Sequence, residues 1–287
     1  QSLGYASAGA PPPPAGGMDP KDGVAFLADL DRGRALVQLG QLDQASPILE
    51  RLAKENGRSV AALAALGSCR LGQGRPKEGE KLYRQALAVT AQDFLYVGLG
   101  RCLALAKDLG AAREAFHRSL RLNPRHAEGY LAWAEVELAT RNVEPARSVL
   151  DRALKADVKD PALFRMRGHI AALQGDLPQA IALFQKALAQ NNRDADVLVD
   201  LGQALFQSGR IAESIEAYEH ALAERPANAA LWKTLGSLYL EGKSDPRRAR
   251  AYFLKALELA PNAPDAEDLR LLVAHSGDAA HLLGVAR

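Results

Sequence analysis

Histidine, cysteine and serine are among the residues of this chain whose chemistry could support catalysis or metal binding. The six histidines are His117, His126, His169, His220, His275 and His281. No two of them form the His-x-x-x-His pair that would place two imidazoles on one helix face. The sequence also lacks the complete phosphate-loop motif Gly-x-x-x-x-Gly-Lys-Ser/Thr and the nucleophile elbow Gly-x-Ser-x-Gly. We therefore predict a protein that is not an enzyme, with no catalytic residue, no metal site and no cofactor.

The two cysteines and one glycine-rich string have structural explanations instead. Cys69 and Cys102 occupy equivalent places in adjacent copies of a repeat, where buried small apolar side chains are expected. Two cysteines are also too few for a disulfide framework. The string GLGRC at residues 98–102 lies inside a predicted helix, so that Gly100 serves helix packing rather than phosphate binding.

Charge and composition exclude two broad classes of protein. The 287 residues include 36 Lys and Arg against 34 Asp and Glu, a net charge of +2, which does not provide the concentrated basic face of a nucleic-acid binder. No apolar run approaches the roughly 18–20 residues that span a bilayer. Abundant Ala, Leu and Gly with only 6% aromatic residues favour close-packed helices over a β-sandwich.

Two ladders of small residues show that the chain is repetitive. The first has a period of 33 or 34 residues and consists of Gly33, Gly67, Gly100, Ala134, Gly168, Gly202 and Gly236. The second consists of Ala45, Gly79, Ala112, Ala146, Ala180, Ser214 and Ala249. Four places after each member of the second ladder stands a large residue: Leu49, Tyr83, Phe116, Leu150, Phe184, Tyr218 and Phe253. Small residues on two paired helices allow their backbones to approach closely, and the large residue fills the space beside them.

This pattern resembles the tetratricopeptide repeat, a helix–turn–helix unit of 34 residues. The last copy carries the pattern most fully, with Trp232, Leu235, Gly236, Tyr239, Ala249, Phe253, Ala256 and Pro261. The resemblance covers about residues 26–262 in seven copies. It implies an all-α fold, a right-handed superhelical solenoid of antiparallel helix pairs with a C-terminal capping helix.

Three segments follow from this assignment. Residues 1–22 contain four consecutive prolines and are expected to form a disordered Pro-rich tether. Residues 23–262 should hold the seven repeats, of which the first has the polar residues Asp29 and Arg32 where apolar ones belong, and the last has one extra residue in its turn. Residues 263–287 should form a capping helix, with Leu269, Leu272 and Val273 covering the seventh repeat, and a ragged end.

The resemblance also implies a partner-binding groove. In this family the first helix of each pair lines a concave surface through the second, fifth, ninth and twelfth places of the repeat. The predicted groove residues are Leu30, Val37, Leu71, Phe94, Val97, Arg101, Leu131, Glu135, Leu138, Arg165, His169, Gln203, Phe206 and Lys233. An exposed apolar strip of this length indicates a partner site. The alternative is that a strongly curved solenoid buries these side chains against one another.

We therefore expect a scaffold that binds a protein or peptide partner and no nucleic acid. The favoured setting is a bacterial assembly factor of the cell envelope, such as pilus, secretin or polysaccharide-export machinery. A periplasmic or outer-membrane-associated location is then favoured over a cytoplasmic one, and a lipid anchor upstream of Gln1 stays open. The alternatives are a cytoplasmic adaptor or regulatory fragment of a longer protein, and the substrate-recruiting arm of an enzyme such as a repeat-bearing glycosyltransferase. The oligomeric state is not predicted.

Overall fold

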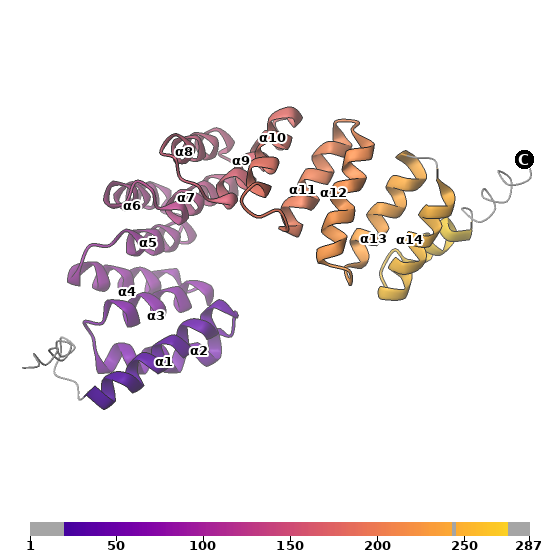
Figure 1. The fold of residues 1–287 in the computed structure, drawn as a ribbon. Helices are drawn as coiled ribbons and strands as arrows, with labels where there is room; N and C mark the ends of the chain where they lie inside the picture. Colours follow the sequence, from indigo (N-terminus) through magenta and orange to yellow (C-terminus); the bar gives the residue numbers. More distant parts are fainter. Residues whose placement is uncertain (1–19, 243–244, 275–287) are drawn as a thin grey trace, which may run out of the picture. The chain divides into compact units, whose positions relative to one another are not determined.

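The structure is a computed structural model that describes residues 20–242 and 245–274 (Figure 1). The described residues form helices and short connections without any β-strand, and no helix among them is both long and apolar enough to cross a bilayer. The chain divides into two compact units, Gln1–Asn142 and Val143–Arg287. The division falls inside the fourth repeat.

The first unit contains seven helices in its described part. They are α1 (Pro20–Gln38), α2 (Leu42–Glu55), α3 (Val60–Gly72), α4 (Pro76–Val89), α5 (Asp93–Leu105), α6 (Leu109–Leu122) and α7 (Ala127–Ala139). The helices pair as α1 with α2, α3 with α4 and α5 with α6, and each second helix also packs against the first helix of the following pair. The first helices α1, α3, α5 and α7 contact one another in that order and so share one face of the unit.

The second unit repeats this arrangement. Its helices are α8 (Val143–Lys155), α9 (Pro161–Leu173), α10 (Leu177–Leu188), α11 (Ala195–Gln207), α12 (Ile211–Glu224), α13 (Ala229–Ser237), the π-helix η1 (Leu238–Gly242) and α14 (Pro246–Leu259), and residues 266–274 are also helical. The pairs α9–α10, α11–α12 and α13–α14 confirm the helix–turn–helix units that the sequence predicts.

Six of the helix pairs are held together by a large side chain that lies directly on a glycine of the partner helix, and the fourth repeat has Ala134 at the corresponding place. A Cβ atom added at Gly168 in α9 would stand 2.6 Å from Cε1 of the buried Phe184 in α10. The same relation joins Gly33 with Leu49, Gly67 with Tyr83, Gly100 with Phe116, Gly202 with Tyr218 and Gly236 with Phe253. The first ladder of small residues and the series of large residues in the sequence therefore form the two sides of one contact.

The turn inside a repeat has a left-handed residue at a fixed place. Four of these residues are glycines, namely Gly40, Gly74, Gly175 and Gly209, with φ between +71° and +79°. In the third and fourth repeats the same place holds Lys107 and Arg141, with φ of +68° and +62°. A side chain at positive φ costs free energy that glycine avoids, so these two turns carry local strain.

A buried carboxylate joins the third repeat to the fourth. Glu137 in α7 is 1% exposed and accepts two hydrogen bonds from Arg113 in α6, Nε to Oε1 at 2.6 Å and Nη2 to Oε2 at 2.8 Å. The indole of Trp133 and the amide of Asn142 donate to the same carboxylate at 3.0 and 3.1 Å. The hydrogen bonds from Arg113 hold the pKa of Glu137 below its usual value, although burial acts in the opposite direction.

The extra residue of the seventh repeat is absorbed by the π-helix η1. Gly236 and Ala249 are separated by 13 residues, whereas the corresponding separation is 12 in the other repeats. The backbone widens at Leu238–Gly242, after the Trp232, Leu235 and Gly236 positions, so these residues keep the faces that the repeat requires.

The N-terminal end of the first unit is polar, as the sequence indicates. The carboxylate of Asp29 accepts a hydrogen bond of 2.5 Å from Nη2 of Arg51, and Arg32 is exposed. Helix α1 begins at Pro20, so residues 20–22 of the predicted tether are helical, and proline is well suited to a first helical turn. The rest of that tether, residues 1–19, lies outside the described residues.

At the C-terminal end, helical residues 266–274 cover the seventh repeat. Leu269 is 5% exposed and Val273 packs with it against the cluster around Phe253. Leu272 was expected beside them, but it is 36% exposed because it lies at the edge of the face that Leu269 and Val273 share. The predicted ragged end, residues 275–287, lies outside the described residues.

Candidate partner-binding groove

An open hollow lies on the shared face of the first helices in the first unit. It has a volume of about 390 Å³. Its lining residues are Arg34, Val37, Gln38, Ala64, Ala65, Ser68, Leu71, Tyr83, Phe94, Gly98, Arg101 and Glu128. Four of them, Val37, Leu71, Phe94 and Arg101, belong to the groove predicted from the sequence. They come from α1, α3 and α5, so the hollow crosses three consecutive repeats.

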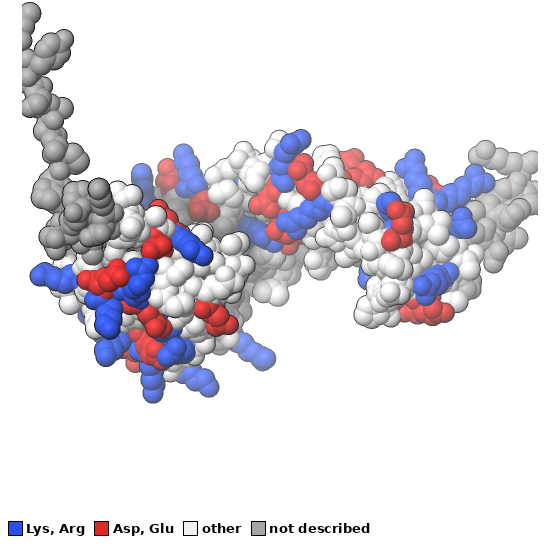
Figure 2. Space-filling model, turned by 90° about the horizontal axis from the view of Figure 1, so that it is seen from below, with Lys and Arg blue, Asp and Glu red and all other residues white. Residues whose placement is uncertain are grey.

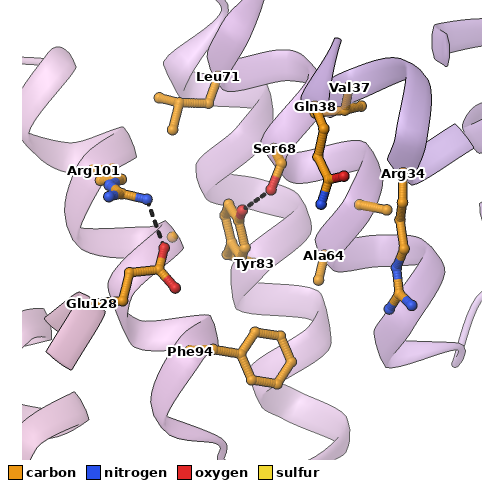
Figure 3. A pocket seen from close by; sticks show the side chains of 12 residues that line it. Arg34, Val37, Gln38, Ala64, Ser68, Leu71, Tyr83, Phe94, Arg101 and Glu128 are labelled. Carbon is orange, nitrogen blue, oxygen red and sulfur yellow. Dashed lines mark hydrogen bonds and ion pairs between the residues drawn. The ribbon is translucent and has the colours of Figure 1, made fainter. Parts of the chain in front are cut away.

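Small residues form the floor of this hollow. Helix α3 presents Ala64, Ala65 and Ser68, and Tyr83 of α4 reaches between α3 and α5 to the centre of the floor (Figure 3). A Cβ atom added at Gly98 in α5 would stand 2.2 Å from Cζ of Tyr83, so only glycine at residue 98 leaves room for this ring. Without that gap the tyrosine could not reach the hollow.

The Tyr83 hydroxyl is held in place at the floor. Its oxygen is 2.7 Å from Oγ of Ser68, in a hydrogen bond that either hydroxyl can donate. Burial raises the pKa of Tyr83 to about 12, so the phenol stays protonated and uncharged at neutral pH. The hollow therefore has an apolar floor with one neutral polar position.

The walls of the hollow carry the charges. On the α5 and α7 side, Nη1 of Arg101 is 2.8 Å from Oε1 of Glu128, and Nη2 is 3.5 Å from Oε2 of Glu135 (Figure 3 shows the first contact). On the α1 side, Arg34 has a side chain that is 48% exposed. Figure 2 shows one face of the molecule, on which acidic and basic side chains alternate without a large area of one sign.

The second unit has a smaller hollow on its first helices. It has a volume of about 190 Å³, and its lining includes His169, Gln203 and Gln207. Asp200 at its edge accepts a 2.6 Å hydrogen bond from Nε of Arg165, and its Oδ2 is 3.0 Å from Nε2 of His169. The predicted groove residues Arg165 and His169 thus join the fifth repeat to the sixth through one carboxylate.

Several predicted groove residues lie elsewhere. Leu30 is 3% exposed and Val97 is 1% exposed, so their predicted place on an open surface is wrong and they belong to the core. This is the burial that the alternative interpretation of the groove describes, limited to two positions. Leu131 and Leu138 are half-buried, and they are not among the residues that line the larger hollow.

The remaining predicted residues belong to the second unit. Phe206 is 43% exposed and is not part of the smaller hollow's lining. Lys233 in α13 donates a hydrogen bond of 2.5 Å to Oδ2 of Asp265, so it ties the seventh repeat to the residues that follow α14. Its charge is already paired within the unit.

Sequence reasoning missed Tyr83 and Gly98 as groove residues. Tyr83 was assigned to helix packing alone because it stands in the ladder of large residues. The available signal was Gly98, since it is the only glycine at the sixth place of any repeat, where the others have Asp31, Ala65, Ala132, Met166, Asp200 and Thr234.

The described residues offer no constellation suited to nucleophilic catalysis. Ser119, His126 and Asp93 lie together, with Nδ1 of His126 3.3 Å from both Oγ of Ser119 and Oδ2 of Asp93. A catalytic triad requires the serine and the carboxylate on opposite ring nitrogens, and Ser119 is fully buried here. Within the described ranges no cluster of three His, Cys, Asp or Glu could hold a metal ion.

Two further motifs do not indicate a catalytic site. Gly242-Lys243-Ser244 matches only the end of a phosphate loop, because Ser237 stands where that motif requires its first glycine. Cys69 and Cys102 are buried free thiols, and burial raises the pKa of Cys102 to about 12. The predicted role of the cysteines as apolar fillers agrees with this burial.

Comparison with known families agrees with the repeat assignment. Three sequence models, each described as a tetratricopeptide repeat, match residues 103–170 and 171–238, residues 30–94 and 70–127, and residues 229–263. Together they extend from residue 30 to residue 263. The matched range therefore contains both hollows.

Two curated proteins are similar to this chain, each at less than 30% sequence identity. The chain is 28% identical over 127 residues to "Protein CTR9 homolog" of Arabidopsis thaliana, covering 44% of this chain and 12% of that protein. It is 25% identical over 272 residues to "Cellulose synthase operon protein C" of Xanthomonas axonopodis, covering 87% of this chain and 18% of that protein. The chain thus spans less than a fifth of the length of these curated relatives.

Among solved structures, the chain is similar to YrrB, which is described as a tetratricopeptide protein with an unusual peptide-binding site. The TM-score is 0.54 at 19% identity, and the match covers 68% of this chain and 97% of that one. At this level of identity the likeness concerns the fold.

Proposed function

Because the chain belongs to the tetratricopeptide-repeat family, we propose that it is a non-catalytic scaffold that binds a segment of a partner protein on its first helices. One observation carries the proposal, the hollow of about 390 Å³ in the first unit. Its wall includes Phe94, which is 40% exposed, with the half-buried Val37 and Leu71 around it. Apolar side chains left open around a concave surface are typical of a protein-binding site.

The binding energy would come from few residues. Burial of one large apolar side chain contributes roughly 1.5–3 kcal/mol, and interfaces concentrate their energy in a small number of such anchors. Leu30 and Val97 are already buried in the core and have little surface left to offer. The exposed ring of Phe94 is therefore the main anchor on the protein's side, supported by Leu71.

We place this scaffold in a bacterial cell-envelope assembly, at the periplasmic face or the outer membrane. The Xanthomonas relative supports this setting, since it is named for a cellulose synthase operon and its match covers 87% of this chain. The match covers only 18% of that protein, so the proposed setting rests on similarity to one segment of the relative. A cytoplasmic adaptor is the competing setting, and the identity of the captured partner distinguishes them.

The proposal is tested by partner capture with a groove variant. The full chain carrying Phe94→Ala and Leu71→Ala should retain its helical circular dichroism and bind the cellular partner at least about tenfold more weakly, equivalent to about 1.4 kcal/mol. A matched control removes two exposed apolar side chains from second helices, with Val89→Ala and Leu122→Ala, and should bind as before. Unchanged binding by a folded groove variant would show that the partner uses another surface.

A further inference from the structure

The two walls of the larger hollow differ in the charge that they can offer to a partner. On the α1 wall, Arg34 is 48% exposed, and among the described residues its one ion pair is to Asp31, with Nη1 and Oδ1 3.9 Å apart. That distance is too long for a hydrogen bond. The guanidinium of Arg34 is therefore available to a carboxylate of an incoming molecule.

The opposite wall has an excess of carboxylate. Arg101 is the one guanidinium that the described part of the chain places between Glu128 and Glu135, whose side chains are 56% and 53% exposed. One positive charge between two negative charges leaves a net charge of −1 on this cluster, in which Arg101 and Glu128 line the hollow and Glu135 lies beside the lining. A cationic side chain of a partner would meet a favourable potential here, whereas an anionic one would be repelled.

Between the walls the hollow is apolar and open. Figure 3 shows Arg34 on one side, the Arg101–Glu128 pair on the other, and Tyr83 with Phe94 between them. The floor consists of small side chains of α3, so the depth comes from missing side-chain volume and not from a mobile loop. A large apolar side chain can enter there and pack against Phe94.

We propose that this hollow binds an extended partner segment in which a large apolar, preferably aromatic, residue is flanked by an acidic residue on one side and a basic residue on the other. In an extended chain, residues i, i+2 and i+4 lie on one face and span roughly 13 Å, so the pattern is acidic-x-aromatic-x-basic or its reverse. The aromatic residue enters the hollow, the acidic residue pairs with Arg34, and the basic residue pairs with Glu128 and Glu135. This inference deepens the proposed function and rests on it.

The segment's chemistry can be tested on the full chain with defined peptides. The protein is labelled on its methyl groups and titrated, by NMR, with the capped peptides Gly-Glu-Ser-Phe-Ser-Lys-Gly and Gly-Lys-Ser-Phe-Ser-Glu-Gly. Further peptides carry two Glu, two Lys, or Ala in place of Phe. The methyl signals of Val37, Ala64 and Leu71 report on the hollow, and those of the exposed Leu173, which lines the smaller hollow of the second unit, report on binding at that competing site.

One of the two mixed-charge peptides should move the hollow's methyl signals with the highest affinity. It should bind about two- to fivefold more tightly than either same-charge peptide, the effect of one exposed ion pair. Replacing Phe by Ala should weaken binding at least about tenfold. The Leu173 signals should stay in place. The proposal is overturned if the Ala peptide binds as well as the Phe peptides, if no peptide binds, or if the Leu173 signals move instead.

A charge reversal tests the role of the α1 wall. With Arg34→Glu, both walls become acidic, so the peptide with two Lys should become the tightest ligand. The matched control is Arg32→Glu, which makes the same charge change on the same helix at a residue outside the hollow and should keep the original order. An unchanged order with Arg34→Glu would refute the assignment of the acidic position.

Failure of this inference is distinguishable from failure of the proposed function. If the Phe94→Ala/Leu71→Ala variant loses the cellular partner but no peptide binds, the scaffold function stands and the proposed segment chemistry is wrong. If that variant keeps the partner as well, the hollow is not the binding site and both proposals fail.

Discussion

The contact between Gly168 and Phe184 allows a sharp test of how the helix pairs are built. In Gly168→Ala, the new Cβ would stand 2.6 Å from Cε1 and 2.9 Å from Cδ1 of a ring that is 1% exposed. Side-chain contacts closer than about 3.4 Å are rare, so the ring or the helix must move by nearly an ångström. The Phe184 ring is also in edge contact with His169, at 5.4 Å between centroids, which restricts its movement.

Two effects of opposite sign determine the size of this change. Overpacking of a core costs about 1–3 kcal/mol. Alanine is favoured over glycine inside a helix by about 0.5–1 kcal/mol. We therefore expect Gly168→Ala to lower the free energy of unfolding by about 0.5–2 kcal/mol, and Gly168→Leu to lower it further.

A second substitution should restore part of this loss. At the equivalent places the fourth repeat carries Ala134 and Leu150, so Gly168→Ala with Phe184→Leu reproduces a combination that the chain already uses. Phe184→Leu alone should cost roughly 1–2 kcal/mol, between the costs known for smaller and larger core truncations. In the double variant the two losses should not add, and the favourable coupling should be at least about 0.5 kcal/mol.

Urea unfolding followed by circular dichroism, with hydrogen exchange of the α9 and α10 amides, measures these free energies locally. The control is Gly110→Ala, where an added Cβ meets only Oδ1 of Asp108 at 3.8 Å, so stability should stay the same or rise by up to about 1 kcal/mol. Additive losses in the double variant, or a Gly168→Ala variant as stabilised as the Gly110 control, would refute the close-contact explanation of the ladders.

Three further outcomes follow from the described contacts. Lys107→Gly should stabilise the chain by about 1 kcal/mol because the residue has a φ of +68°, whereas Lys107→Ala should not, as chemical denaturation will show. Arg113→Ala should lower the free energy of unfolding by about 1.5–3 kcal/mol because it leaves the buried Glu137 carboxylate without its main donor, while Arg118→Ala, at an exposed pair, should have a much smaller effect in the same assay. Because the pKa of Glu137 is lowered by folding, its contribution is present at neutral pH and is lost as the pH falls below about 4.5, so Glu137→Gln should flatten the acid limb of a stability–pH profile.

The sequence was sufficient to predict the helix pairs because their contacts recur at a fixed period. A small residue opposite a large residue recurs in every repeat, so Gly168 and Phe184 have counterparts along the chain. The division into two units has no such periodic signal. The strained turns at Lys107 and Arg141 were also missed, because neither residue type indicates a positive φ.

The groove was predicted less completely than the fold. The place of a residue within a repeat indicates which face of the helix it occupies, but not how deeply neighbouring helices cover it. Val97 and Phe94 stand three residues apart on α5, yet Val97 is 1% exposed and Phe94 is 40% exposed. Tyr83 reaches the floor only because Gly98 lies beside it in space, and a contact between residues on different repeats leaves no regular pattern in the sequence.

Because of the π-helix at Leu238–Gly242, the seventh repeat is one residue longer and still keeps the packing contacts of the other repeats. One added residue widens a single helical turn, and the side chains on either side keep their register. Gly236 still lies against Phe253, since a Cβ atom added at Gly236 would stand 2.5 Å from Cε1 of that ring. An insertion at this place is therefore close to neutral for the fold. Evolution can lengthen the turn without rebuilding the core, and a designer can use the same turn to introduce a label or a short loop.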